Sequence, residues 1–166
     1  MAGIAFVICK KSELEKLKNY PKRSFYLSLY QQYKYFEEKG EMQFTPPVQV
    51  AYALKQAIKE FFEEGAENRY KRYKENYETL IKGLKRLGFK FLIGEKHQSG
   101  ILVTLTEPEN FNFTEVHDRL YEKGFTIYPG KLYNTNTFRL AVMGAINSKD
   151  IKKFLKELKL IMKGPK

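Results

Sequence analysis

The sequence predicts an α+β domain: a small, mainly antiparallel sheet with helices on one face, preceded by a strand and a helix that belong to a different layer. Hydrophobic residues recur at the three-to-four-residue spacing of amphipathic helices over residues 70–87 and 151–162, and they alternate with polar residues at the two-residue period of strands in between. The order helix, two strands, helix, two strands, helix is typical of a sheet covered by helices on one side.

The first 45 residues do not fit that layer. Residues 4–9 are a short apolar run typical of a buried strand, and Ser12 and Glu15 have the spacing of a capping box for a short helix. Residues 19–42 are rich in aromatic side chains and are predicted to form one helix that ends at Gly40. We therefore expect residues 1–45 to be the edge of a second, larger domain and residues 46–166 to form a small domain.

The segment Thr45-Pro46-Pro47 predicts the start of a helix. The threonine hydroxyl can accept a hydrogen bond from a first-turn N–H, and proline at the first helical position lacks only an N–H that would have no partner there. This helix is expected to run to about Glu64 and to end at Gly65, and the next one to end at Gly88.

After Gly88 the hydrophobic period changes to two, which indicates strands. Thr114 is expected to cap a helix that ends at Gly124, and Ser148 is expected to cap the last helix. The predicted strands cover residues 89–93, 101–105, 126–128 and 138–142.

Composition limits the classes of protein to consider. At 166 residues the chain can bury the core of one ordinary domain, and no apolar run approaches the roughly 20 residues of a spanning helix. Residues 1–11 lack the features of a signal peptide, so a soluble, cytoplasmic protein is expected. The single cysteine, Cys9, excludes an intrachain disulfide, and His97 and His117 lack the spacing of metal ligands, so we expect no metal site.

The net charge of +11 raises an alternative, a basic binding module for nucleic acid or an acidic protein partner. The basic residues lie between apolar positions at helical spacing, which favours solvated helix faces instead. A nucleic-acid-binding sheet would also show aromatic residues on an exposed strand face, whereas residues 89–93 and 101–105 have the pattern of core strands.

Three segments carry a family resemblance: Gly3-Ile-Ala-Phe-Val-Ile8, Phe44-Thr-Pro-Pro47, and Gly124-Phe-Thr-Ile-Tyr-Pro-Gly-Lys131 followed by Thr137-Phe-Arg-Leu140. In order and spacing they resemble the C-terminal portion of the class V, fold-type-I aminotransferases, which depend on pyridoxal phosphate. Residues 67–73 and 87–89 are similar to the branch of that family that acts on 2-aminoethylphosphonate and pyruvate.

The resemblance implies a homodimer whose subunits each have a large cofactor-binding domain and a small C-terminal domain. The implied reaction moves the amino group of 2-aminoethylphosphonate, a small-molecule amine, to the 2-oxo acid pyruvate. The family's Schiff-base lysine would precede Met1, and Lys10 and Lys11 follow the predicted strand as solvated side chains. We therefore expect the chain by itself to lack catalysis and stable cofactor binding, and to need a homo-oligomer or a separate chain carrying the large domain.

Two positions match functional residues of the family. Thr45 matches the threonine that reaches the cofactor phosphate of the partner subunit, although it can equally cap its own helix. Arg139 matches the arginine that holds the carboxylate or phosphonate of the substrate, with a structural ion pair as the alternative. Ala141 and Val142 stand where the family usually has glycine and asparagine, and are expected to enlarge and dry the edge of the pocket. The turn of residues 128–131 borders the active site in the family, although turn geometry alone can also explain its proline and glycine.

Overall fold

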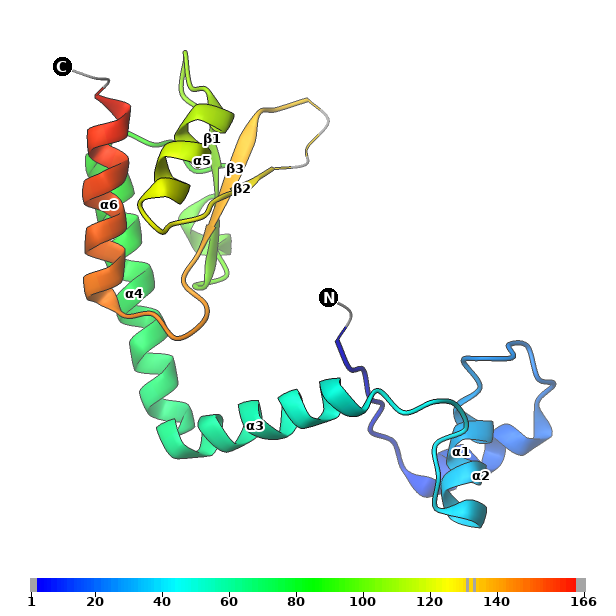
Figure 1. Cartoon of the computed structure of the whole chain (residues 1–166). Coiled ribbons are helices and arrows are strands. Elements are labelled where there is room, and N and C mark those ends of the chain that lie inside the picture. The colour runs from blue at the N-terminus through cyan, green and yellow to red at the C-terminus, as the bar shows by residue number, and fades with distance from the viewer. Residues whose placement is uncertain (1–2, 131, 133, 164–166) are drawn as a thin grey trace. The chain divides into compact units, whose positions relative to one another are not determined.

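The computed structural model describes residues 3–130, 132 and 134–163 (Figure 1). The chain divides into two compact units, Met1–Glu63 and Glu64–Lys166. Lys131, part of the predicted turn, lies outside the described residues. The assignment of residues 1–45 and 46–166 to two domains of a complete enzyme stays a prediction.

Unit 1 is helical and contains no buried residue in its helices. Helix α2 begins after Ser28, whose hydroxyl accepts from Gln31 N, and ends at Gly40, which has a φ of 68°. The predicted end at Gly40 is confirmed, but the helix is shorter than expected because the chain turns at Ser24, whose hydroxyl accepts from Leu27 N. The elements are α1 (Lys11–Lys16), the 3₁₀-helix η1 (Leu17–Asn19), α2 (Leu29–Lys39) and the first part of α3 (Val48–Glu64).

Two predictions for the start of unit 1 are wrong. Residues 4–9 form no strand, because a strand needs a hydrogen-bonding partner and the described part of unit 1 contains no other strand. Their side chains are exposed, Ile8 to 89%. The capping box is also absent from α1: the residue before the helix is Lys10, no side chain caps it, and Ser12 lies inside the helix.

The predicted start of α3 is shifted by two residues. Helix α3 begins at Val48, and Pro47 O accepts from Ala51 N at 2.9 Å, so Pro47 rather than Thr45 stands directly before the helix. A proline disfavours the helical conformation of the residue before it, so Pro47 keeps Pro46 out of the helix and delays the first helical turn. The predicted end is confirmed, since Gly65 follows with a φ of 79°.

Unit 2 is the predicted α+β layer. Its three strands form an antiparallel sheet in the order β1-β3-β2, and α4 and α6 lie side by side against it (Figure 1). The elements are α4 (Ala66–Arg86), the 3₁₀-helix η2 (Glu95–His97), β1 (Leu102–Thr106), α5 (Phe113–Glu122), β2 (Tyr128–Pro129), β3 (Thr137–Ala141) and α6 (Ser148–Met162).

The core lies between the helices and one face of this sheet. Alternate strand residues are buried, Val103 and Leu105 on β1 and Phe138 and Leu140 on β3, because successive side chains of a strand point to opposite faces. The helices add buried side chains at helical spacing, and the whole cluster is one contiguous core. The main helical members are Leu80, Leu84, Val116, Leu120, Ile151, Phe154 and Leu158.

The predicted strand over residues 89–93 is reduced to one bridge between Phe91 and Leu105, with Thr106 N donating to Lys90 O at 3.0 Å. Leu92 N still donates to Thr104 O at 3.0 Å, and after Leu92 the chain leaves the sheet and turns through η2. Strand β2 is also shorter than predicted and starts later. Pro129 has no N–H with which to continue the ladder.

Both predicted helix caps in unit 2 are displaced by one or two residues. Asn112, not Thr114, caps α5 by accepting from Glu115 N at 3.1 Å. Asn147, not Ser148, caps α6, and Asp150 completes a capping box. Asparagine caps at least as well as serine or threonine, so an asparagine one or two positions earlier can replace the predicted residue.

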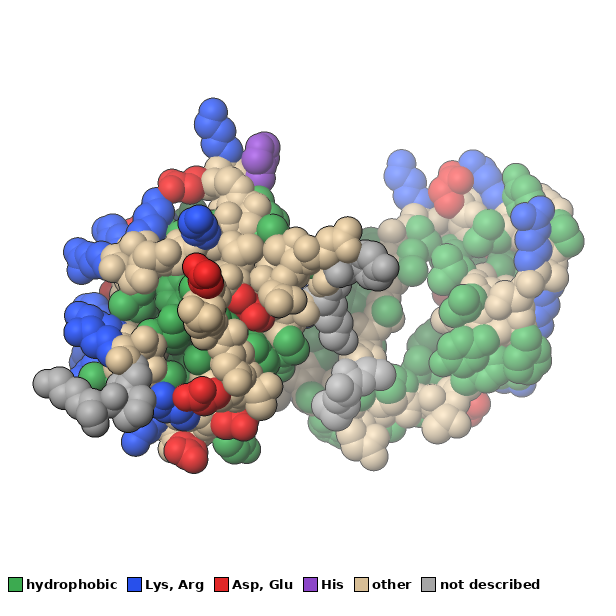
Figure 2. All heavy atoms as spheres, turned by 90° about the horizontal axis from the view of Figure 1, so that it is seen from above, with side chains coloured by type: hydrophobic (Ala, Val, Ile, Leu, Met, Phe, Trp, Pro, Cys, Tyr) green, Lys and Arg blue, Asp and Glu red, His purple; other side chains and the backbone are tan. Residues whose placement is uncertain are grey.

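Most basic residues of unit 2 form solvated helix faces. Figure 2 shows Lys and Arg side chains gathered along the side that α4 and α6 form. The exposed ones on α4 and α6 or directly after α6 are Lys71, Lys74, Lys82, Lys85, Arg86, Lys149, Lys152, Lys153, Lys156, Lys159 and Lys163. In the described part of the chain, no helix is long and apolar enough to cross a membrane.

Candidate anion-binding site at Arg139

Arg139 lies in the middle of β3, on the sheet face opposite the core, because its neighbours Phe138 and Leu140 point into the core. Its Nη2 donates to Pro129 O at 3.4 Å, a long and weak hydrogen bond. Its Nε is buried and, among the residues that the structure describes, has no hydrogen-bond partner. A buried donor without an acceptor is costly, so this guanidinium is suited to receive an anion.

Tyr128 is the direct neighbour of Arg139 in the sheet. The two residues face each other in the antiparallel pairing of β2 with β3, so their side chains lie on the same face. The side chain of Tyr128 is 63% exposed. Within the described ranges, no carboxylate forms an ion pair with Arg139.

A cavity of about 400 Å³ adjoins Arg139 within unit 2. Its lining includes the core residues Leu140, Ile151 and Phe154 and the exposed residues Tyr128, Ala141 and Met143. Its size falls in the range of about 300–1,000 Å³ that small-molecule pockets occupy. Of the two positions expected to alter the pocket edge, only Ala141 lines the cavity. Val142 is fully buried in the core instead.

The loop that follows β3 is held by a charged network at the start of α4. Arg72 Nη1 donates to Gly144 O at 2.6 Å and to Ile146 O at 3.2 Å. The same guanidinium donates to both carboxylate oxygens of Glu64, at 2.6 and 2.9 Å, and Arg69 Nε donates to Glu64 Oε2 at 2.6 Å. These hydrogen bonds, from Arg72 first and then Arg69, lower the pKa of Glu64 from 4.5 to about 2. The network fixes the loop that carries Met143.

Asn76 supports the same loop from α4. Its Nδ2 donates to Ile146 O at 2.9 Å, and the residue is only 1% exposed. Sequence reasoning did not identify Asn76 or Arg72. A signal was available, because Asn76 is a polar residue four positions before Leu80 and eight before Leu84, inside the buried stripe of α4.

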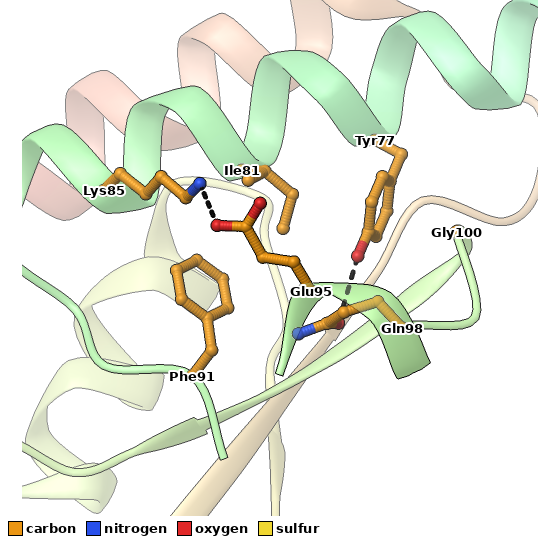
Figure 3. A pocket seen from close by; sticks show the side chains of 7 residues that line it. All are labelled: Tyr77, Ile81, Lys85, Phe91, Glu95, Gln98 and Gly100. Carbon is orange, nitrogen blue, oxygen red and sulfur yellow. Dashed lines mark hydrogen bonds and ion pairs between the residues drawn. The ribbon is translucent and has the colours of Figure 1, made fainter. Parts of the chain in front are cut away.

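A second cavity, of about 190 Å³, lies between α4 and the η2 loop (Figure 3). Its polar groups are already paired with one another: Tyr77 Oη donates to Gln98 at 3.0 Å, and Lys85 forms an ion pair with Glu95. Burial, with a smaller contribution from Glu95, raises the pKa of Tyr77. These contacts fasten the loop to α4, and they make this cavity a poorer candidate site than the one at Arg139.

The described residues do not form a complete site for pyridoxal phosphate. Lys10 and Lys11 are exposed, and Lys11 Nζ is paired with Glu37 at 2.8 Å, which raises the pKa of Lys11. A lysine that forms a Schiff base needs the opposite shift. Thr45 is exposed in unit 1, whereas Arg139 belongs to unit 2.

Comparison with solved structures identifies the class of fold. The chain resembles alanine–glyoxylate aminotransferase from Nostoc sp. with a TM-score of 0.73 and 23% identity, over 92% of this chain and 42% of that one. At this identity the likeness concerns the fold alone, which is that of the C-terminal part of an aminotransferase. The predicted fold class is confirmed.

Curated relatives are closer in sequence. The 2-aminoethylphosphonate–pyruvate transaminase of Phocaeicola vulgatus is 37% identical over 164 residues, which is 97% of this chain and 45% of the relative. That of Bacillus mycoides is 40% identical over 156 residues, 92% of this chain and 42% of the relative. No protein-family model matches the chain. The resemblance to the C-terminal part of 2-aminoethylphosphonate–pyruvate transaminases is thus confirmed, and the chain spans less than half of their length.

Proposed function

We propose that this chain forms the C-terminal part of a pyridoxal-phosphate-dependent transaminase that moves the amino group of 2-aminoethylphosphonate to pyruvate. The buried Nε of Arg139, which has no partner in the described residues, is the observation that carries this proposal. The sequence identity to transaminases of that name supports the choice of substrates.

In this proposal Arg139 binds the anionic end of each substrate. The donor carries a phosphonate and the acceptor a carboxylate, and a guanidinium can bind either group through two parallel N–H donors. One arginine therefore serves both halves of the reaction. Its place on a strand, between two core residues, fixes the backbone from which the guanidinium projects.

Thr45 is proposed to contact the phosphate of the cofactor in a complete, homodimeric enzyme. When bound, pyridoxal phosphate supplies the electron sink for amino-group transfer. The Schiff-base lysine and the other residues that bind the cofactor would come from a large domain, which belongs either to a longer protein or to a separate chain. Residues 1–45 are assigned to that large domain and residues 46–166 to the small one.

A chimera tests the proposal. The matched C-terminal part of the Bacillus mycoides relative is replaced by this chain, and alanine formation from 2-aminoethylphosphonate and pyruvate is measured. We expect an active chimera, in which Arg139→Gln lowers kcat/KM about a hundredfold while cofactor binding, followed by its absorbance, is retained. The matched control Arg86→Gln, at an exposed arginine of α4, should leave kcat/KM unchanged.

A second measurement uses the chain alone. After incubation with pyridoxal phosphate and reduction with borohydride, peptide mapping should find no single lysine labelled stoichiometrically. One such lysine would contradict the proposal that the Schiff-base lysine lies outside this chain. An active chimera whose kcat/KM does not respond to Arg139→Gln would contradict the role of Arg139.

A further inference from the structure

We propose that the cavity beside Arg139 binds an apolar group, so that the site accepts, besides the two small substrates of the proposed function, organic acids whose phosphonate or carboxylate is attached to a branched or aromatic hydrocarbon. This inference rests on the proposed function of Arg139 as the anion-binding residue and extends it to the class of substrate. All the residues that line the cavity belong to unit 2.

Much of the lining of the cavity is apolar. Leu140, Ile151 and Phe154 belong to the buried core and also line the cavity. Water against such side chains is poorly hydrogen-bonded, and its replacement by a hydrocarbon group is favourable. A two-carbon phosphonate bound at Arg139 would leave most of a space of about 400 Å³ unfilled.

The two charged residues that line the cavity, Asp150 and Arg139, differ in whether they can bind a ligand. Asp150 also lines it, but Asp150 Oδ2 accepts from Asn147 N at 2.9 Å in the capping box of α6, where the helix N-terminus stabilises its negative charge. Arg139 also lines it, and within the described ranges no carboxylate forms an ion pair with Arg139. The cavity therefore combines one cationic side chain that no carboxylate neutralises with an apolar space, which matches an acid with a single charged end.

The rim explains how such a ligand would enter. Tyr128, Ala141 and Met143 line the cavity and are exposed, so the opening is bordered by an aromatic ring, a methyl group and a flexible thioether. Methionine adapts its shape to different apolar partners. Arg72 holds the backbone of the loop that carries Met143, through Gly144 O and Ile146 O. The loop backbone is therefore fixed, while the Met143 side chain can adapt to the ligand.

The test measures binding of two phosphonates to the isotope-labelled 166-residue chain by NMR titration. Methylphosphonate reports the anion site alone, and phenylphosphonate adds an apolar group of the proposed kind. We expect phenylphosphonate to bind at least about tenfold more tightly, with shifts at Ala141 and Met143. Ala141→Phe, which fills the opening, should remove this gain and leave methylphosphonate binding unchanged.

Met143→Gln is the second variant, and it should also remove most of the gain. Its matched control is Leu160→Gln, since Met143 is 51% exposed and Leu160, on α6 away from the cavity, is 53% exposed. Spectra of each free variant verify that the fold is retained. Arg139→Gln should weaken both phosphonates.

The outcomes separate the two proposals. Equal affinity for both phosphonates, with loss of both in Arg139→Gln, would overturn the apolar site and leave the proposed role of Arg139 standing. Binding that does not respond to Arg139→Gln would overturn both. A gain for phenylphosphonate that survives both Ala141→Phe and Met143→Gln would place the apolar group elsewhere and overturn this inference.

Discussion

Glu64 links acid sensitivity to the loop beside the candidate site. Because its pKa in the folded chain is lowered to about 2, its contribution to stability is fully present above its ordinary pKa of 4.5 and is lost as the pH falls towards 2. We predict that Glu64→Gln lowers the thermal midpoint at pH 7, and that the difference from the wild type shrinks as the pH falls from 5 to 2. Thermal unfolding followed by circular dichroism across this range measures it.

The neighbouring Glu63 provides a matched control. Its carboxylate is exposed and lies 3.7 Å from Lys59, a surface pair of small energetic value. Glu63→Gln should therefore give nearly the same midpoint as the wild type at every pH. A difference for Glu64→Gln that stays constant from pH 7 to pH 2 would show that its carboxylate charge is not the cause.

Gly130 is required by close packing rather than by turn geometry. A Cβ atom at this position would meet the Thr137 hydroxyl and would lie 2.6 Å from the carbonyl oxygen of Thr137, which is backbone and cannot rotate away. We predict that Gly130→Ala forces β2 away from β3 and lowers the free energy of unfolding by about 1–3 kcal/mol. Urea denaturation measures the change.

Gly94→Ala is the control for this substitution. Gly94 has a φ of −62°, and an added Cβ would meet nothing within 4 Å. Its free energy of unfolding should stay within a few tenths of a kcal/mol of the wild type. Equal stabilities of the two alanine variants would contradict the steric explanation for Gly130.

At the scale of elements, the start of α6 distinguishes two neighbouring cap candidates. Asn147 accepts from Lys149 N at 2.9 Å, and Asp150 accepts from Asn147 N in return. We predict that Asn147→Ala lowers the free energy of unfolding by about 0.5–2 kcal/mol, whereas Ser148→Ala, inside the first turn, changes it little. Chemical denaturation of the two variants side by side decides between them. A larger loss of unfolding free energy for Ser148→Ala would show that Ser148, the residue predicted from the sequence, caps the helix.

At the scale of the whole molecule, unit 1 exposes an unusual number of large apolar side chains. Phe6 is 72% and Ile8 89% exposed, and the segment of residues 25–27 is also exposed. Burial of each such side chain is worth roughly 1.5–3 kcal/mol. We predict that the chain associates with itself through residues 3–44, and that a double substitution of Phe6 and Ile8 by serine weakens this association.

Light scattering across a dilution series measures that association. The control is Leu160→Ser, which removes an exposed apolar side chain from unit 2. It should leave the association unchanged. A wild-type chain that remains a monomer at the highest concentrations would defeat the prediction, and an equal effect of both variants would assign the association to another surface.

The elements that could be predicted are those with strong local signals. The amphipathic stripe of α4 and the glycines after α2, α3 and α4 fixed three helix ends, because a residue with positive φ strongly favours glycine. The start of each helix was less certain, since Asn112 competes with Thr114 and Asn147 with Ser148 over one or two positions. Residues 4–9 have a strand pattern but no partner strand, so propensity alone did not make them a strand.

The sequence by itself determined the α+β class, the family resemblance and Arg139 as the candidate residue, because hydrophobic period and motif spacing are local properties of the chain. Only the tertiary structure decided that Arg139 Nε is buried without a described partner, that Ala141 but not Val142 faces the cavity, and that Arg72 holds the loop of Gly144. Each of these depends on contacts between residues far apart in the chain. Such contacts are set by how the helices pack on the sheet, which no local pattern encodes.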